Sequence, residues 1–241
     1  MKTKILSFSA IILGINLTFC PVLFSEDVVD SRLNAESKKH KLTYQAPNRS
    51  APLVRIDGIR RGFGSALPSL YVLAPKQVGY TLKEKPTLYW YQSEPSAAQF
   101  EFVLLGEDKT KPIFTFQNTP SNVSGIQSVR LVEHNVKLSK GIQYTWYVTI
   151  VPDPEHRTKD IFASGMIERI TPSPRVAKGL VNKSKKDLVY VLAEGGIWYD
   201  ALETISSLIE SDPREVSLRE LRAELLYQGN LPEIADYDRA F

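Results

Sequence analysis

The chain has 241 residues, of which 43% are hydrophobic and 10% aromatic, and a formal net charge of +3. This composition is that of a folded protein with a sizeable core, and it excludes an intrinsically disordered chain. The near balance of 30 basic and 27 acidic residues gives no case for nucleic-acid binding. Cys20 is the single cysteine, so an internal disulfide and a cysteine-based zinc site are excluded.

Residues 1–25 have the layout of a secretory signal peptide, in which two lysines precede an apolar stretch over residues 5–19. Cleavage is expected after Ser25, and loss of the two lysines would leave a net charge of +1. Two alternatives stay open. Residues 5–24 approach the ~20 residues that span a bilayer and could be kept as an anchor, and Cys20 could carry a lipid. The sequence predicts an exported protein of the periplasm or cell envelope.

Residues 26–65 are polar and lack periodicity, which predicts a flexible linker. The end of this stretch, residues 55–64, combines arginines with glycines. These residues could bind an anionic ligand, or they could form a solvated linker near a negatively charged membrane surface. The second interpretation is favoured.

Residues 66–172 contain about seven strand-like segments separated by turn residues. The longest, residues 142–151, alternates apolar and polar side chains with the period of a half-buried strand. Short strands at this spacing predict an immunoglobulin-like β-sandwich. The expected strands are residues 70–73, 87–92, 99–105, 113–117, 126–132, 142–151 and 161–170.

The hydrophobic period changes near Pro172 and Pro174, after which apolar residues recur every three or four positions. A strand-only block followed by a helix-only block predicts a sandwich with a helical extension over residues 173–241, rather than an interleaved α/β fold. Because this small number of helices cannot bury a core alone, we expect them to pack on the sandwich. The expected helices are residues 185–194, 198–210, 215–228 and 232–240.

Two resemblances support this division. Trp90 on an early strand and Tyr144 on a late strand resemble fibronectin type III modules, in which two such residues meet across the core. Residues 193–202 and 225–235 both place a glycine before an acidic residue and an alanine, which resembles tetratricopeptide helix pairs. Both are likenesses of fold, and fold alone does not give function.

Four segments together resemble an exported bacterial family known as domain of unknown function 928: residues 58–64, 86–90, 144–146 and 196–202, the last being the most specific. The likeness runs from about Arg55 to the C-terminus. It implies strands followed by helices and supplies no catalytic residues. The family's lead segment often ends in a cysteine that this chain lacks, so no disulfide role carries over. Similar members are often encoded near sensors with extracellular CHASE2-type domains, which implies an accessory role in signalling.

Patterns for catalysis and metal binding are weak. His40, His134 and His156 lack metal-ligand spacing. The loop from Asp153 to Asp160 gathers acidic groups around His156 and could hold a weak cation or act as an acid–base pair, but a proline-rich turn explains it better. No serine lies in a hydrolase-type turn, and no phosphate-binding loop lies between a strand and a helix. We predict a non-enzymatic protein without cofactor or metal.

The remaining candidates are binding functions. We predict an adaptor that presents sandwich loops or a helical groove to a protein partner, for which a membrane sensor is one candidate. The binding surface is expected at the edge of the contact between sandwich and helices. The predicted contact residues are Trp198, Tyr199, Arg222 and Tyr227.

A glycan- or cell-wall-binding module is the first alternative. It would use Tyr89, Tyr91 and Tyr147, because outward tyrosines can stack on sugar rings. The favoured interpretation of these tyrosines is burial under the C-terminal helices, with Trp198 and Tyr199 in the contact. A hydrolase-type enzyme is the second alternative and has little support.

Overall fold

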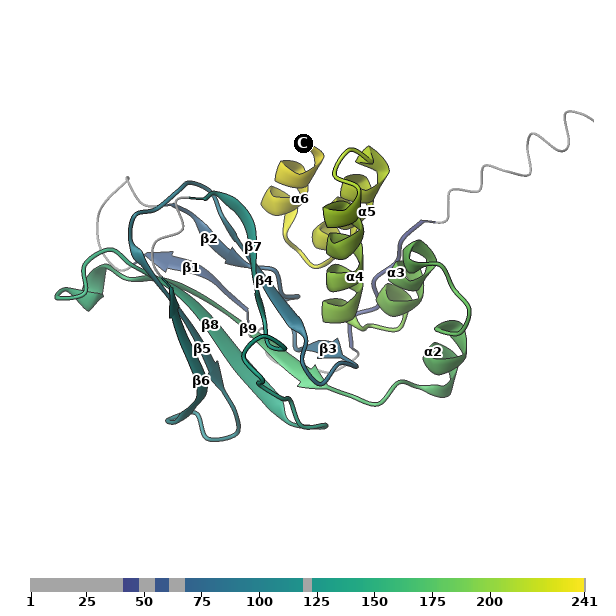
Figure 1. The fold of residues 1–241 in the computed structure, drawn as a ribbon, viewed down its shortest axis with the longest axis horizontal. Helices are drawn as coiled ribbons and strands as arrows, with labels where there is room; N and C mark the ends of the chain where they lie inside the picture. The colour runs from purple at the N-terminus through teal and green to yellow at the C-terminus, as the bar shows by residue number, and fades with distance from the viewer. Residues whose placement is uncertain (1–40, 48–54, 61–67, 119–122, 241) are drawn as a thin grey trace, which may run out of the picture. The chain divides into compact units, whose positions relative to one another are not determined.

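The computed structural model describes residues 41–47, 55–60, 68–118 and 123–240, in which nine strands are followed by five α-helices (Figure 1). The strands are β1 (Ile56–Arg60), β2 (Leu70–Val72), β3 (Gly79–Thr81), β4 (Thr87–Gln92), β5 (Gln99–Leu105), β6 (Pro112–Asn118), β7 (Gly125–Arg130), β8 (Gln143–Val151) and β9 (Ile161–Arg169). The helices are α2 (Pro174–Gly179), α3 (Lys185–Glu194), α4 (Trp198–Ser211), α5 (Val216–Gln228) and α6 (Pro232–Arg239). The predicted signal segment lies outside the described residues.

The strands form two sheets. The larger sheet has the order β1-β9-β8-β5-β6 with antiparallel neighbours. Strand β3 runs parallel to the second half of β9, on the edge whose first half pairs with β1. The smaller sheet is antiparallel with the order β2-β4-β7. The predicted β-sandwich followed by helices is confirmed.

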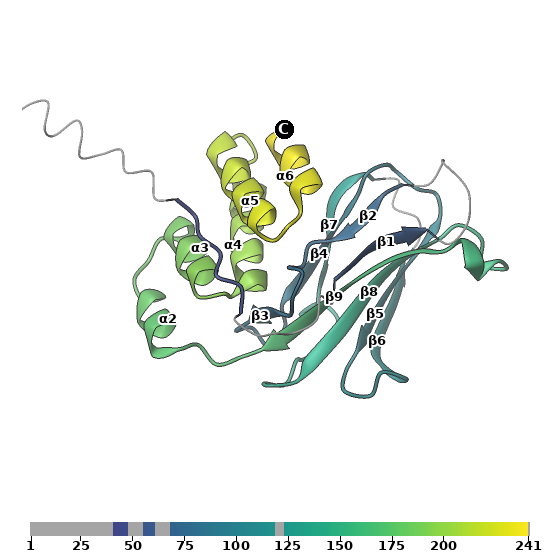
Figure 2. The same cartoon turned by 180° about the vertical axis from the view of Figure 1, so that it is seen from behind.

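Alternation along β4 places the smaller sheet between two layers. Trp90 faces the larger sheet, where its ring stacks on Phe100 with centroids 4.8 Å apart. Tyr91 points to the other side, where its ring lies 4.7 Å from that of Tyr237 on α6. Figures 1 and 2 show α4, α5 and α6 on this side of the smaller sheet. The helices therefore pack on the sandwich, as their number predicts.

The helix boundaries follow local chemistry. Ser184 Oγ accepts a hydrogen bond from the Asp187 amide and caps α3, as its position predicts. Pro174, near which the hydrophobic period changes, is the first residue of α2, a position that proline's fixed φ favours. Within the described ranges, no helix is long and apolar enough to cross a membrane.

The linker predicted over residues 26–65 is wrong where the structure describes it. Residues 56–60 form β1, and residues 41–47 lie extended against the helices. Leu42 is only 2% exposed. Neither segment could be predicted from the sequence, because a five-residue edge strand and a single buried leucine produce no periodic pattern.

Candidate functional site

The Gly-Ile-Trp-Tyr-Asp motif anchors the helices to the sandwich. Trp198 Nε1 donates to the Leu73 carbonyl at 2.9 Å. Tyr199 Oη accepts from Trp146 Nε1 and donates to the Met166 carbonyl, each at 3.0 Å. Both motif rings are fully buried. Trp198 and Tyr199, predicted as partner contacts, thus lie inside the contact between α4 and the sandwich and not on an exposed surface.

Asp200, the next residue of the motif, ties α4 to β3. One carboxylate oxygen accepts from Thr81 Oγ1 at 2.5 Å and the other from the Leu82 amide at 3.0 Å. Burial raises the pKa of Asp200 to about 6, because the two hydrogen bonds offset the loss of water only in part.

This raised pKa gives a pH dependence with a definite sign. The unfolded carboxyl ionises near 3.8 and the folded one near 6, so the stability contributed by Asp200 is complete below 3.8 and is lost as the pH rises through 6. We expect the unfolding free energy of wild type minus that of Asp200→Asn to fall by about 3 kcal/mol over this interval. Urea unfolding at each pH measures the difference. A constant or rising difference would contradict the assignment.

Arg222, another predicted partner contact, is mostly buried, although it lines a cleft described below. Its Nε and Nη2 donate to the two carboxylate oxygens of Asp238, each at 2.6 Å, and Nη1 donates to Ser206 Oγ at 3.2 Å. Asp238 is 0% exposed. Tyr227 is the one predicted contact residue that lies open, with 59% of its surface exposed.

The three tyrosines of the glycan alternative do not share a surface. Tyr89 is buried beneath the helices, which raises the pKa of its hydroxyl, and Tyr91 packs on Tyr237. Tyr147 lies half-buried on the larger sheet, beside Phe162 at 6.5 Å. The favoured burial under the helices is thus seen for Tyr89 and, in part, for Tyr91.

In the loop from Asp153 to Asp160, several charged groups form local pairs. His156 Nδ1 lies 2.7 Å from an Asp153 carboxylate oxygen. Arg157 joins Asp160 at 2.7 Å and Glu101 at 2.8 Å. Asp153 and Asp160 thus each have a local partner, which fits the turn interpretation, although Asp160 Oδ1 is buried without a hydrogen-bond partner among the described residues.

The other histidines lie elsewhere. His134 packs against the rings of Phe114 and Phe116 at 4.9 and 4.8 Å, whereas His40 falls outside the described residues. In the part of the chain that the structure describes, no three His, Cys, Asp or Glu residues gather closely enough to hold a metal ion.

A polar cleft of about 340 Å³ lies between β7 and helices α4, α5 and α6, and we call it the seam cleft. It occupies the edge of the contact between sandwich and helices, where a binding surface was expected. The residues that line it and bear polar side chains are Tyr89, Ser124, Gln127, Ser128, Ser206, Glu210, Arg219, Arg222 and Tyr237. Strand β7 is the edge strand of its sheet, paired with β4 on one side alone among the described strands.

The charged side chains of the seam cleft differ in how fully they are paired. Asp238 is engaged by Arg222, and Arg219 Nη1 lies 3.9 Å from the same carboxylate. Arg219 Nε is buried and has no hydrogen-bond partner among the described residues. Glu210 pairs with Arg130 at 3.3 Å. A buried donor left without an acceptor costs ~1–3 kcal/mol, so the cleft favours an oxygen acceptor, above all a carboxylate.

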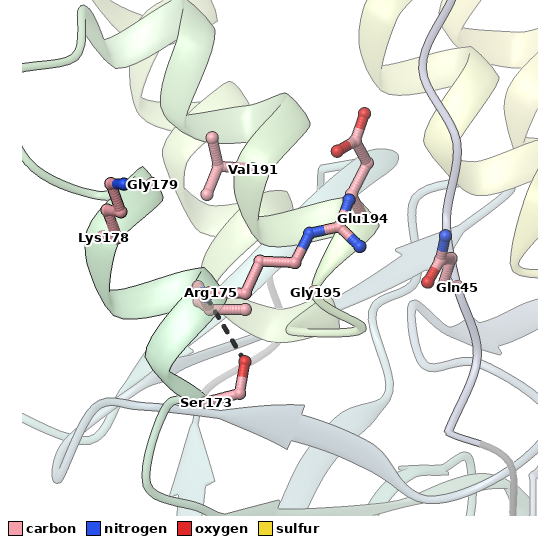
Figure 3. Close-up of a pocket in the computed structure, with 9 residues that line it drawn as sticks. Gln45, Ser173, Arg175, Lys178, Gly179, Val191, Glu194 and Gly195 are labelled. Atoms are coloured by element: carbon pink, nitrogen blue, oxygen red, sulfur yellow. Dashed lines mark hydrogen bonds between the residues drawn. The ribbon is translucent and has the colours of Figure 1, made fainter.

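A second cavity, of about 580 Å³, lies between α2, α3 and the extended residues 41–47 (Figure 3). Val176 and Val191 contribute apolar surface, and Arg175, Glu194 and the amide of Gln45 contribute polar groups. Figure 3 shows the guanidinium of Arg175 extending between the two helices. The cavity thus adjoins both a helix pair and an extended segment.

Comparison with known proteins places the chain in a family. The family model "Domain of Unknown Function (DUF928)" matches residues 56–238. The chain belongs to the DUF928 family. The resemblance carried by residues 196–202 and the other three segments is therefore confirmed. No curated protein matches this DUF928 chain.

Solved structures add little. A crystal structure of an engineered protein shares 9% identity with the DUF928 chain, covering 44% of this chain and 21% of that one, with a TM-score of 0.30. The DUF928 chain thus spans about a fifth of that protein's length. A multi-domain immunophilin from Arabidopsis thaliana shares 8% identity, with coverage of 80% and 98% and a TM-score of 0.17. Neither likeness supports an argument about fold or function.

Sequence reasoning missed Arg219 in this DUF928 chain. Arg219 and Arg222 are three residues apart on α5, so both lie on one face of the helix. That spacing is the sequence feature that could have pointed to Arg219. Solvated arginines on a helix have the same spacing, so it does not by itself indicate a site.

Proposed function

We propose that this DUF928 protein is an exported, non-enzymatic binding or adaptor protein of the bacterial envelope, whose seam cleft holds an acidic group of a protein partner. The signal-peptide layout of residues 1–25 supports export. The observation that carries the binding proposal is Arg219, which lines the cleft with a buried Nε that has no acceptor among the described residues.

The surroundings of the seam cleft suit a peptide chain. An extended segment can pair its main chain with an edge strand while its side chains enter neighbouring pockets, and β7 is such an edge. Ile126 and Ile209 offer apolar contact beside the polar groups. A carboxylate from the segment would meet the donor edge of a planar guanidinium, which binds carboxylates in a fixed geometry.

The test is a photo-crosslinking pulldown from envelope preparations of the source bacterium. We expect wild type to capture a protein, with a membrane sensor as the first candidate. Arg219→Gln should bind the purified partner about 10- to 100-fold more weakly, because a hydrogen bond to a charged group contributes ~1.5–3 kcal/mol. Arg214→Gln is the control, since Arg214 is exposed and does not line the cleft.

Two outcomes would oppose the proposal. Equal affinity of the partner for wild type and Arg219→Gln would remove the seam cleft as its site. Retention on cell-wall material with no captured protein would favour the glycan alternative, which would then draw on Tyr147 and its neighbour Phe162.

A further inference from the structure

Residues 41–47, which we call the strap, lie extended against α3 and α5 within one compact unit. Gln228 on α5 contacts the strap main chain twice. Its Nε2 donates to the Leu42 carbonyl at 2.8 Å, and its Oε1 accepts from the Tyr44 amide at 2.7 Å. The Gln45 amide donates to the Ala193 carbonyl at the end of α3, at 3.1 Å. These bonds recognise an extended backbone whatever its sequence.

Side chains fix the register of the strap. Leu42 is almost fully buried, and the ring of Tyr44 meets that of Trp198 edge-on with centroids 4.9 Å apart. Gly196 has φ +74°, and a Cβ there would lie 2.6 Å from the Gln45 carbonyl oxygen. The surface between α3 and α5 is thus a groove that accepts a leucine and, two positions on, an aromatic ring.

The strap fits this groove imperfectly. Tyr44 Oη is buried and has no hydrogen-bond partner among the described residues. Burial also raises the pKa of this hydroxyl. The cavity between α2 and α3 begins at Gln45, so open volume continues where the strap passes (Figure 3). A phenylalanine in place of Tyr44 would keep the ring contact and remove the unpaired hydroxyl.

We infer that the groove between α3 and α5 is a peptide-binding groove that the strap occupies in cis, and that its other occupant is an extended segment of a partner protein with the pattern Leu-x-Phe. Gln228 binds the main chain of this segment as it binds that of the strap. Trp198 takes the phenylalanine ring edge-on. The inference stands apart from the seam cleft, because none of the strap contacts involves a residue that lines that cleft.

The test uses the full chain and two labelled peptides, Lys-Leu-Thr-Phe-Gln-Ala-Pro and the native strap sequence with tyrosine. Fluorescence anisotropy measures their affinity for wild type and for a variant with a weakened strap, Tyr44→Ala. We expect the variant to bind the phenylalanine peptide at least about tenfold more tightly than wild type does, because its own strap competes less. The phenylalanine peptide should bind about fivefold or more tightly than the tyrosine peptide.

A second measurement keeps the test valid if Tyr44→Ala folds poorly. Chymotrypsin cleaves after tyrosine, so excess phenylalanine peptide should speed cleavage of wild type at Tyr44 by displacing the strap, and a scrambled peptide should not. Gln228→Ala should abolish saturable binding. Binding that survives Gln228→Ala, or a cleavage rate that the peptide leaves unchanged, overturns the inference. Dimers of wild type that dissociate in Tyr44→Ala would assign the groove to a second copy and overturn the partner assignment.

Discussion

Replacing Asp238 by alanine is expected to lower the free energy of unfolding by about 3–5 kcal/mol. The substitution leaves the guanidinium of Arg222 buried without its carboxylate, which is the costly way to break a buried ion pair. The guanidinium would keep a hydrogen bond to Ser206 Oγ only, which is a neutral acceptor. Urea unfolding followed by circular dichroism at neutral pH measures the change.

Two comparisons separate this effect from a general loss of charge. Asp236→Ala removes an exposed aspartate from the same helix, where it pairs with Arg239, and should leave stability nearly unchanged. The double variant Arg222→Met/Asp238→Leu replaces the pair by apolar groups and should recover most of the loss. If Asp238→Ala lowers the free energy of unfolding no more than Asp236→Ala does, Arg222 and Asp238 do not form a buried ion pair.

Gly229→Ala is expected to destabilise the protein by about 3 kcal/mol or more. A Cβ at this position would overlap the ring of Trp198. The ring has little room to yield, because its Nε1 is hydrogen-bonded to the Leu73 carbonyl and the ring of Tyr44 packs edge-on against it. Thermal unfolding measures the loss, and the near-ultraviolet circular dichroism of the buried tryptophan should weaken in parallel.

Gly106→Ala is the matched control. A Cβ there would lie 3.6 Å from Ile113 Cγ2 and 3.8 Å from Tyr144 Cε1, which are ordinary contact distances. We expect a change of less than ~0.5 kcal/mol. Equal effects of the two substitutions would show that crowding against Trp198 is not the cause.

The sequence predicted elements that carry their own local signal. The alternation of residues 142–151 gives β8 within one residue, and Ser184 marks the start of α3. Strands β1 and β3 were missed because five and three residues are too few to show a period of two. They exist because β9 offers them a free edge, and that edge is created only when the sheet forms.

The roles of the candidate residues were harder to predict than the elements. An aromatic residue or an arginine on a helix looks the same in sequence whether it faces solvent or the core. The difference lies in distant partners: Leu73 is 125 residues from Trp198, and Asp238 is 16 residues from Arg222. The sequence could predict that a binding surface lies at the edge of the sandwich–helix contact. It could not single out Arg219, because the features that distinguish this residue are its position in the cleft and its unpaired, buried Nε.

The strap can reach its folded position only late in the synthesis of the chain. The bond between Leu42 and Gln228 joins residues 186 positions apart, so it cannot form until nearly the whole chain has left the ribosome. Until then Leu42 and the groove surface of α3 have no cover. A nascent or prematurely terminated chain that lacks α5 would therefore display an extended segment with Leu42 and Tyr44 uncovered, the kind of feature that chaperones and proteases recognise in unfinished proteins.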